Sequence, residues 1–280
     1  MSLKSMIAAA VCVGLSFGAA AADIPQGQIK GSACVHTESS MAAAMTHAWT
    51  VLPASLTGGK VYEGLYQDAP QCVGKAPALI FVPGSGGLNP NIKAFQTWLA
   101  EELGIASITA DSFQLPDRMT YSSPIPRTDY EKIHTLRSSE LTAAVAFLKK
   151  QPWFDGRFVI AGTSEGAVAV ARYQAAQNAV PEKGRIIFSW SCEDNYHVVS
   201  HKTAIPEGLP VLNVMSATDK YFSTANSYIG NPQAVGHCAK ALADNPNASV
   251  VLIPKAPHTL MNTPQAREAV EGFLKDRLLK

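Results

Sequence analysis

Short runs of apolar residues alternate along this chain with longer stretches in which apolar residues recur every three or four positions. Residues 78–82 form the clearest continuous run and stop at Pro83-Gly84, as expected of a parallel strand that is covered on both faces. Residues 91–103 place their apolar side chains on one helical face and end at Gly104, a frequent helix stop. The same reasoning predicts strands over residues 105–109, 158–161, 185–190, 210–216 and 249–253, and helices over residues 130–150, 164–177, 234–243 and 264–279.

Three segments lie outside this regular alternation. Residues 60–66 alternate like an edge strand, and residues 111–129 contain three prolines and are predicted to form a loop. Residues 23–57 are interpreted as an N-terminal extension with a helix over residues 41–49. The repeated β–α units predict an α/β fold in one domain over residues 58–280, with a mostly parallel central sheet flanked by helices on both faces.

The first 22 residues have the pattern of a secretory signal peptide. Lys4 precedes an uncharged, mostly apolar run over residues 6–19, and three alanines end the segment just before Asp23. The run is too short to span a bilayer. We therefore expect residues 1–22 to be removed and the mature protein to be exported, either periplasmic or secreted by a bacterium, without a membrane anchor. A buried N-terminal helix is the alternative.

Composition and charge exclude other classes of protein. The chain has 280 residues, of which 47% are hydrophobic and 16% are charged, and this is too apolar for a disordered protein. Its 23 basic and 22 acidic residues give a net charge of +1, so there is no basic excess to neutralise the phosphates of a nucleic acid. A chain of this length can bury roughly three quarters of its unfolded surface, which predicts a large core.

Export to an oxidising compartment would allow the cysteines to form disulfides. Four remain after removal of the signal peptide, namely Cys34, Cys72, Cys192 and Cys238, and an even number in an oxidising compartment predicts two disulfides. Of the three possible pairings we favour Cys34–Cys72 and Cys192–Cys238, because each joins cysteines that are near in sequence. Free buried thiols are the alternative. No Cys-x-x-Cys or Cys/His spacing indicates a metal site.

The strongest chemical signal is the segment Gly162-Thr163-Ser164-Glu165-Gly166. An apolar strand leads directly into it and an alanine-rich helix follows at once, which is the strand–turn–helix context of a serine nucleophile. Such a turn lifts the serine hydroxyl clear of the sheet and points the first amides of the helix at the position of an oxyanion. An ordinary turn with serine as the helix N-cap is the alternative.

Two later residues complete a candidate catalytic triad. Asp219 and His258 each follow a predicted strand, so both belong to the edge at which open α/β sheets build their sites. Their order after Ser164 is that of nucleophile, acid and base in this architecture. His258 would take the serine proton and Asp219 would orient the imidazole. Asp194 or Glu193, after the preceding strand, is the competing acid.

Acyl transfer also requires amide donors for the oxyanion. One predicted donor is the backbone N–H of Glu165, directly after the nucleophile. The second is predicted in the glycine-rich loop after residues 78–82, with Ser85 preferred and Gly86 as the alternative. The Glu165 side chain is expected to cap the amides of the new helix rather than to contact substrate. The loop lacks the Lys-Ser/Thr of a phosphate-binding loop and the spacing of a dinucleotide fingerprint. Acyl transfer by a serine implies no cofactor, and no ligand spacing indicates a metal.

With these motifs the chain resembles the α/β-hydrolase superfamily, most closely its dienelactone-hydrolase-like branch. The resemblance covers residues 78–258 and implies an α/β-hydrolase fold and hydrolase chemistry. Pro83 stands where the family usually has histidine, Ser164 where the founding members have cysteine, and Ala167 where a further glycine is common. The resemblance still implies the fold and the hydrolase chemistry despite these departures. It does not imply that dienelactone is the substrate. The matching segments are residues 82–87, 110–113, 137–144 and 162–166, together with Asp219 and His258.

The sequence therefore predicts an exported serine hydrolase that cleaves a small-molecule carboxylic ester through an acyl-enzyme. A serine peptidase of the same fold is one alternative. A non-catalytic α/β-hydrolase-like binding protein is another, and the intact triad argues against it. Arg118 and Arg127 could favour an acidic substrate, although surface arginines without a ligand are the simpler interpretation. The side chains expected to border the pocket are Arg118, Tyr121, Arg127, Trp190 and Tyr221.

Overall fold

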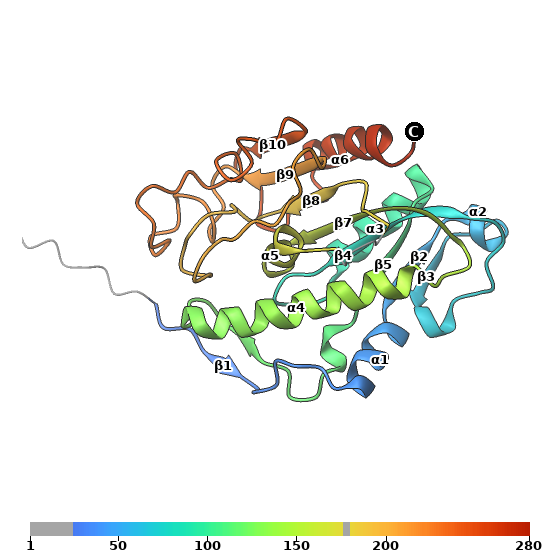
Figure 1. Ribbon diagram of the computed structural model, residues 1–280, viewed down its shortest axis with the longest axis horizontal. Helices are drawn as coiled ribbons and strands as arrows, with labels where there is room; N and C mark the ends of the chain where they lie inside the picture. Colours follow the sequence, from blue (N-terminus) through green and yellow to red (C-terminus); the bar gives the residue numbers. More distant parts are fainter. Residues whose placement is uncertain (1–24, 176–179) are drawn as a thin grey trace, which may run out of the picture.

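An eight-stranded sheet forms the centre of the computed structural model, which describes residues 25–175 and 180–280 (Figure 1). The six strands from β10 to β5 run parallel, whereas β2 is antiparallel to both β5 and β3. This confirms the predicted α/β class and the mostly parallel sheet. In spatial order the strands are β10 (Ala248–Ile253), β9 (Val211–Ser216), β8 (Arg185–Phe188), β7 (Phe154–Thr163), β4 (Ala76–Val82), β5 (Ala106–Thr109), β2 (Trp49–Leu52) and β3 (Tyr62–Leu65).

Helices cover both faces of the sheet because its central strands are apolar on both sides. In β4, Ile80 and Val82 pack on the side of the first group of helices, and Leu79 and Phe81 pack on the side of the second. All seven residues of β4 are buried. The first group contains α1 (Glu38–Thr46), α2 (Ala54–Thr57), α4 (Arg127–Leu148) and α5 (Glu165–Arg172), and the second contains α3 (Pro90–Leu103) and α6 (Pro264–Arg277).

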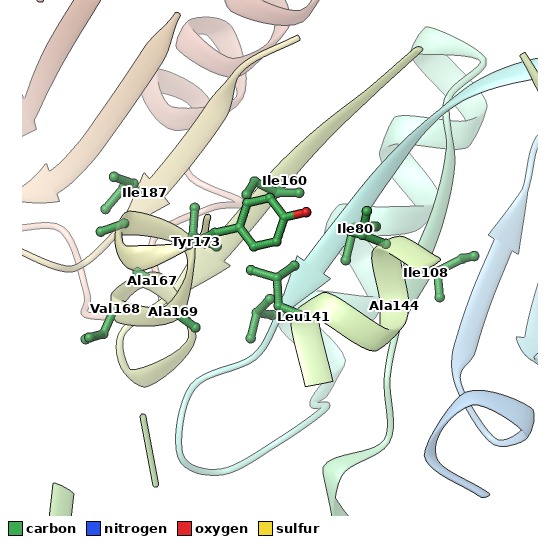
Figure 2. Packing of buried hydrophobic residues seen from close by; sticks show 14 of the residues in the cluster. Ile80, Ile108, Leu141, Ala144, Ile160, Ala167, Val168, Ala169, Tyr173 and Ile187 are labelled. Carbon is green, nitrogen blue, oxygen red and sulfur yellow. The ribbon is translucent and has the colours of Figure 1, made fainter. Parts of the chain in front are cut away.

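Small side chains bring α5 close to the middle of the sheet. Its residues from Glu165 to Ala171 are all buried, because the helix lies between the sheet and the long helix α4. Figure 2 shows isoleucines from four adjacent strands facing α4 and α5. This packing fixes the N-terminus of α5, and therefore Ser164, at the carboxyl end of β7. The labelled side chains of this layer are Ile80, Ile108, Ile160 and Ile187 from the sheet, Leu141 and Ala144 from α4, Ala167, Val168 and Ala169 from α5, and Tyr173.

The segment predicted as an N-terminal extension contributes to the central sheet. Residues 23–57 supply α1, β2 and α2, and β2 is inserted between β5 and the edge strand β3. Just upstream, β1 (Ile29–Lys30) pairs with β6 (Thr120–Tyr121) to form a separate two-stranded sheet. The predicted loop 111–129 therefore contains a strand, as well as the short 3₁₀ helix η2 (Ser112–Gln114) and the first turn of α4. A second 3₁₀ helix, η1 (Tyr66–Asp68), follows β3. Residues 1–22, the predicted signal peptide, lie outside the described part of the chain.

Two predicted helices differ from the structure. Residues 234–243 form turns instead of a helix, because tertiary partners occupy their backbone amides. The carboxylate of Glu193 accepts the N–H groups of Val235 (2.8 Å) and Gly236 (2.9 Å). The helix predicted over residues 164–177 ends at Arg172, and residues 176–177 lie outside the described part of the chain. Arg185 donates to the carbonyl oxygens near this end, which takes acceptors away from further helical turns.

Candidate active site

Ser164 occupies a sharp turn between β7 and α5. Its backbone has φ 55° and ψ −121°, a strained conformation for a residue with a Cβ atom. The flanking glycines make the turn possible: a Cβ atom on Gly166 would lie 2.1 Å from the carbonyl oxygen of Val82, and one on Gly162 would lie 2.7 Å from that of Gly166. The helix therefore starts against the end of β4, and Ser164 projects beyond the carboxyl edge of the sheet.

Asp219 and His258 meet at the same edge. The Asp219 Oδ2 atom lies 2.7 Å from His258 Nδ1, and the Asp219 side chain is fully buried. Its other oxygen accepts the backbone N–H groups of Tyr221 and Phe222, both at 2.9 Å. Burial alone would raise the pKa of Asp219, but the hydrogen bond from His258, the charge on that ring and the two amides lower the pKa below its ordinary value. The acid is thus held as a carboxylate that faces the imidazole.

The two competing acids are engaged elsewhere. Glu193 accepts the amides of residues 235 and 236, as described above. Asp194 is largely exposed and accepts the backbone N–H of His201 at 2.9 Å, with the His201 ring 3.2 Å away. Of the three candidate acids, all of them described, Asp219 is the one that contacts His258.

Two serines that the sequence did not single out hold the loop carrying His258. Ser189, directly after β8, donates its hydroxyl to the carbonyl oxygen of His258 at 2.5 Å. Ser216, the last residue of β9, donates to the carbonyl oxygen of Ala256 at 2.7 Å. Both hydroxyls are buried and come from neighbouring strand ends, so the sheet itself fixes the backbone on either side of the imidazole. In the sequence, their positions near the ends of predicted strands could have indicated that they belong to the site.

Ser164 and His258 face one pocket of about 270 Å³. Their side chains are not hydrogen bonded to each other, and such contacts are often long before substrate binds. Of the side chains predicted to border the pocket, Tyr121 and Tyr221 do so. Trp190 instead lies fully buried in the core, and Arg127 lines a separate surface cavity. The pocket is lined by Ser85, Tyr121, Ser122, Ser123, Ser164, Tyr196, His197, Tyr221, Phe222 and His258.

Part of the pocket wall is built from uncharged aromatic and hydroxyl groups. The Tyr121 hydroxyl lies 3.0 Å from His197 Nε2. Burial, with smaller contributions from His134 and His258, holds the pKa of His197 well below its ordinary value, so this ring is neutral. Burial likewise holds the pKa of Tyr121 well above its ordinary value, so the phenol stays protonated. The wall therefore offers hydrogen bonds without a formal charge.

The predicted oxyanion donors lie beside Ser164. In the glycine-rich loop, the Gly87 N–H closes a turn on the Gly84 carbonyl oxygen at 3.0 Å, and Ser85 lines the pocket. A Cβ atom on Gly84 would lie 3.3 Å from the Ser164 Cβ atom, so loop and nucleophile are in close approach. Within residues 25–175 and 180–280, the N–H groups of Ser85 and Glu165 have no protein acceptor.

The Glu165 carboxylate does not cap α5, which corrects the sequence-based expectation. It accepts Arg137 Nε at 2.6 Å and Arg118 at 3.1 Å, and all three side chains are buried. Burial would raise the pKa of Glu165, but the charges of Arg137 and then Arg118 lower it below its ordinary value. Arg118 is thus part of a buried ion-pair network rather than of the pocket wall. The position of Glu165 in the sequence, next to a tight turn, did not indicate its distant partners Arg118 and Arg137.

The cysteines follow half of the predicted pairing. Cys192 and Cys238 form a disulfide, whereas Cys34 and Cys72 carry free thiols. The Cys34–Cys72 prediction is wrong because different parts of the fold hold the two segments. The residue before Cys34 pairs with the segment around Arg118, whereas the residue after Cys72 donates its N–H to Leu56 in α2 at 2.8 Å. Nearness in sequence did not imply nearness in space.

No three His, Cys, Asp or Glu side chains gather closely enough to hold a metal ion in the described part of the chain. Among the same residues, no helix is both long and apolar enough to cross a membrane.

Comparison with known proteins identifies the fold. No protein-family model matches the sequence, and no curated protein matches it. Solved structures do match. Est1E from Butyrivibrio proteoclasticus has a TM-score of 0.51 and 19% identity, over 83% of this chain and 94% of that chain. A dienelactone hydrolase-like promiscuous phosphotriesterase from metagenomic libraries has a TM-score of 0.52 and 16% identity, over 74% of this chain and 88% of that chain.

XC6422 from Xanthomonas campestris, described as an α/β serine hydrolase without a lid, is similar at a TM-score of 0.52 and 17% identity, over 83% of this chain and 89% of that chain. The class of structure is therefore an α/β-hydrolase fold. Within that class, its structural neighbours include dienelactone-hydrolase-like proteins. At these identities the likeness establishes the fold, and the chemistry must be argued from the residues of this chain.

Proposed function

We propose that this protein is an exported serine hydrolase that cleaves carboxylic esters through an acyl-enzyme intermediate. The observation that carries the proposal is the 2.7 Å contact between Asp219 and His258, in a pocket that also contains Ser164 on its strained turn. A serine hydroxyl becomes a nucleophile at neutral pH when an oriented imidazole can take its proton.

The reaction follows from these positions. Ser164 Oγ attacks the ester carbonyl carbon while His258 Nε2 takes the hydroxyl proton, and Asp219 stabilises the imidazolium at Nδ1. The N–H groups of Ser85 and Glu165 would bind the negative oxygen of the tetrahedral intermediate. The intermediate collapses, and the departing alcohol receives the proton from His258. Water then attacks the acyl-enzyme with His258 as the base, and the acid leaves with Ser164 restored.

The pocket supports a compact, uncharged acyl group. Its volume of about 270 Å³ is below the range of about 300–1,000 Å³ that is usual for drug-sized ligands. No Lys, Arg, Asp or Glu is among its described lining residues. Because Arg118 is buried in ion pairs and Arg127 lies in another cavity, neither arginine supports the acidic substrate considered from the sequence. Tyr121, Ser122 and Ser123 also line the pocket. Their hydroxyl groups each have one protein partner and could make a further hydrogen bond to a polar substituent.

A burst experiment tests this function. With p-nitrophenyl acetate in excess, the wild-type protein should release about one equivalent of p-nitrophenol rapidly and then continue at a slower steady rate. The reason is that p-nitrophenolate is a good leaving group, so acylation should be faster than deacylation. Ser164→Ala should remove both phases. A panel of acetyl, butyryl and feruloyl esters with matched amides would then define the substrate, since Est1E, a neighbour by fold, has been solved with ferulic acid bound. Cleavage of amides but not esters would favour a peptidase, and no turnover would favour a binding protein.

Export is a separate part of the proposal and rests on the sequence of residues 1–22. N-terminal sequencing of protein recovered from the periplasm or medium of a bacterial host should read from Asp23. Protein that stays in the cytoplasm with Met1 or Ser2 at its N-terminus would contradict export without affecting the proposed chemistry.

A further inference from the structure

One buried guanidinium group contacts both backbone segments that carry the proposed oxyanion donors. Arg137, on α4, is fully buried. Its Nε atom donates to the Glu165 carboxylate at 2.6 Å and one terminal nitrogen donates to the Gly84 carbonyl oxygen at 2.8 Å. The other terminal nitrogen donates to Glu140 at 2.9 Å. The planar fork of arginine fixes these directions relative to one another.

The contact with Gly84 sets the direction of the Ser85 N–H. The Gly84 carbonyl and the Ser85 N–H belong to one peptide unit, which is planar, and in the trans form its oxygen and hydrogen point in opposite directions. Arg137 holds the oxygen on the side of α4, and the Gly87 N–H donates to the same oxygen at 3.0 Å. The Ser85 N–H is thereby turned away from α4, and it has no protein acceptor among the described residues. Since Ser85 lines the pocket, its N–H is available at that wall.

The contact with Glu165 holds the second donor. Glu165 follows Ser164 directly, and its carboxylate is anchored to Arg137 while its backbone N–H has no protein acceptor within the described residues. The glycine-rich loop and the first turn of α5 already lie in close approach at Gly84 and Ser164. Arg137 adds one rigid group that is hydrogen bonded to both segments.

Charge gives Arg137 a second effect on the same donors. A cation on the Gly84 oxygen polarises the peptide and strengthens the Ser85 N–H as a donor, as in other chains of hydrogen bonds. The charges of Arg137 and Arg118 also balance those of Glu165 and Glu140. Burial would raise the pKa of Glu140, but opposing influences, of which the charge of Arg137 is the largest, lower this pKa to about 2. A developing oxyanion near Ser164 thus meets a balanced network instead of an uncompensated carboxylate.

We propose that Arg137 is a positioning residue that aligns both oxyanion donors, Ser85 and Glu165, through its contacts with the Gly84 carbonyl and the Glu165 carboxylate. This inference rests on the proposed function. It assigns to Arg137 an effect on the transition state and little effect on binding of the ester itself, because a ground-state carbonyl needs these donors less than the tetrahedral oxyanion does.

The test is Arg137→Lys, which keeps the charge but loses the fork. Deleting one oxyanion donor typically lowers kcat by about 10²–10³-fold, so misaligning the donors should lower kcat by about 10–10²-fold with KM changed by less than about threefold. The inhibition constant of phenylboronic acid, which forms a tetrahedral adduct with the active serine, should rise by the same factor as kcat falls.

Arg185→Lys is the matched control. Arg185 is also fully buried, pairs with Glu182 at 2.7 Å and donates to backbone carbonyls of Val170 and Tyr173, but it lies at the far end of α5. It should lose thermal stability to a similar degree and keep kcat within about threefold of wild type. Equal losses of kcat in both lysine variants, or an unchanged boronate constant in Arg137→Lys, would overturn the inference.

A charge-balanced variant covers the case in which Arg137→Lys does not fold. Arg137→Met combined with Glu140→Leu removes one charge of each sign and leaves the Arg118–Glu165 pair in place, and such replacements of buried ion pairs are often tolerated. A folded double variant should show the same loss of kcat, and wild-type kcat would refute the inference. The boronate adduct of the wild-type protein gives a reading without any variant: its oxygen should lie about 2.7–3.1 Å from both donor nitrogens, and an oxygen elsewhere would also refute it.

Failure of the proposed function looks different. If the wild-type protein neither turns over esters nor binds the boronate, the serine hydrolase assignment fails and this inference fails with it. If the wild type is active and Arg137→Lys is equally active, only the role of Arg137 is wrong.

Discussion

Replacing Asp219 with asparagine should reverse the tautomer of the His258 ring. In the native side chain, Oδ1 accepts two backbone amides at 2.9 Å and Oδ2 faces His258 Nδ1 at 2.7 Å. An amide nitrogen cannot accept hydrogen bonds, so the asparagine oxygen must stay on the two amides and its NH₂ must face the ring. His258 Nδ1 must then accept a hydrogen bond from this NH₂ group, so the ring proton lies on Nε2. A protonated Nε2 cannot take the proton of Ser164.

The expected loss follows from that reversal. Asp219→Asn should lower kcat by about 10⁴-fold, equivalent to about 5.5 kcal/mol of transition-state stabilisation. The assay is steady-state hydrolysis of a p-nitrophenyl ester, with circular dichroism and the Tm as evidence that the fold is kept. Asp194→Asn is the matched control, because Asp194 is exposed and contacts His201 rather than His258. A loss smaller than about tenfold for Asp219→Asn, or an equal loss for Asp194→Asn, would refute the reasoning.

Three further predictions concern stability and covalent structure. Thiol titration of the denatured, unreduced mature protein should find two reactive thiols, those of Cys34 and Cys72; none would restore the second disulfide predicted from the sequence. Gly166→Ala should destabilise the protein by about 3 kcal/mol, as overpacking does, because a Cβ atom there would lie 2.1 Å from a carbonyl oxygen. The control Gly272→Ala, in open space on α6, should be neutral or stabilising. Equal Tm values for the two variants would contradict this prediction. The pKa of Glu140 is lowered from 4.5 to about 2, so its charge stabilises the fold fully above about pH 4.5 and less as the pH falls toward 2. The difference in Tm between the wild type and Glu140→Gln should therefore shrink over that pH interval. A constant difference would show that the charge plays no part.

The sheet and the gathering of Ser164, Asp219 and His258 could be predicted from the sequence because both follow from strand order. Parallel strands all end at one edge, so residues that directly follow strands are brought to that edge by the topology alone. The apolar runs of β4 and β7 were long enough to be recognised as covered on both faces. Each residue of the candidate site was therefore placed by an element whose pattern is local in the chain.

The features that the sequence analysis missed depend on distant partners. The strand β2 is a short segment whose place between β5 and β3 is set by two antiparallel pairings. The predicted helix at 234–243 gave way to the Glu193 carboxylate and the disulfide of Cys238. The contact of Glu165 with Arg137 joins residues 28 positions apart. No local period encodes such contacts, and they decide how α5 and its surroundings are fixed.

The central claim is that Ser164 is the activated nucleophile of this protein. Mature protein treated with a fluorophosphonate and analysed by intact and peptide mass spectrometry tests it most directly. A single phosphonyl adduct should form on Ser164, with loss of fluoride. Its formation should slow in the presence of phenylboronic acid, in proportion to the occupancy of the site by that inhibitor. Ser164→Ala, folded to the same Tm, should remain unlabelled. An adduct on another residue, or an unlabelled wild-type protein, would contradict the claim.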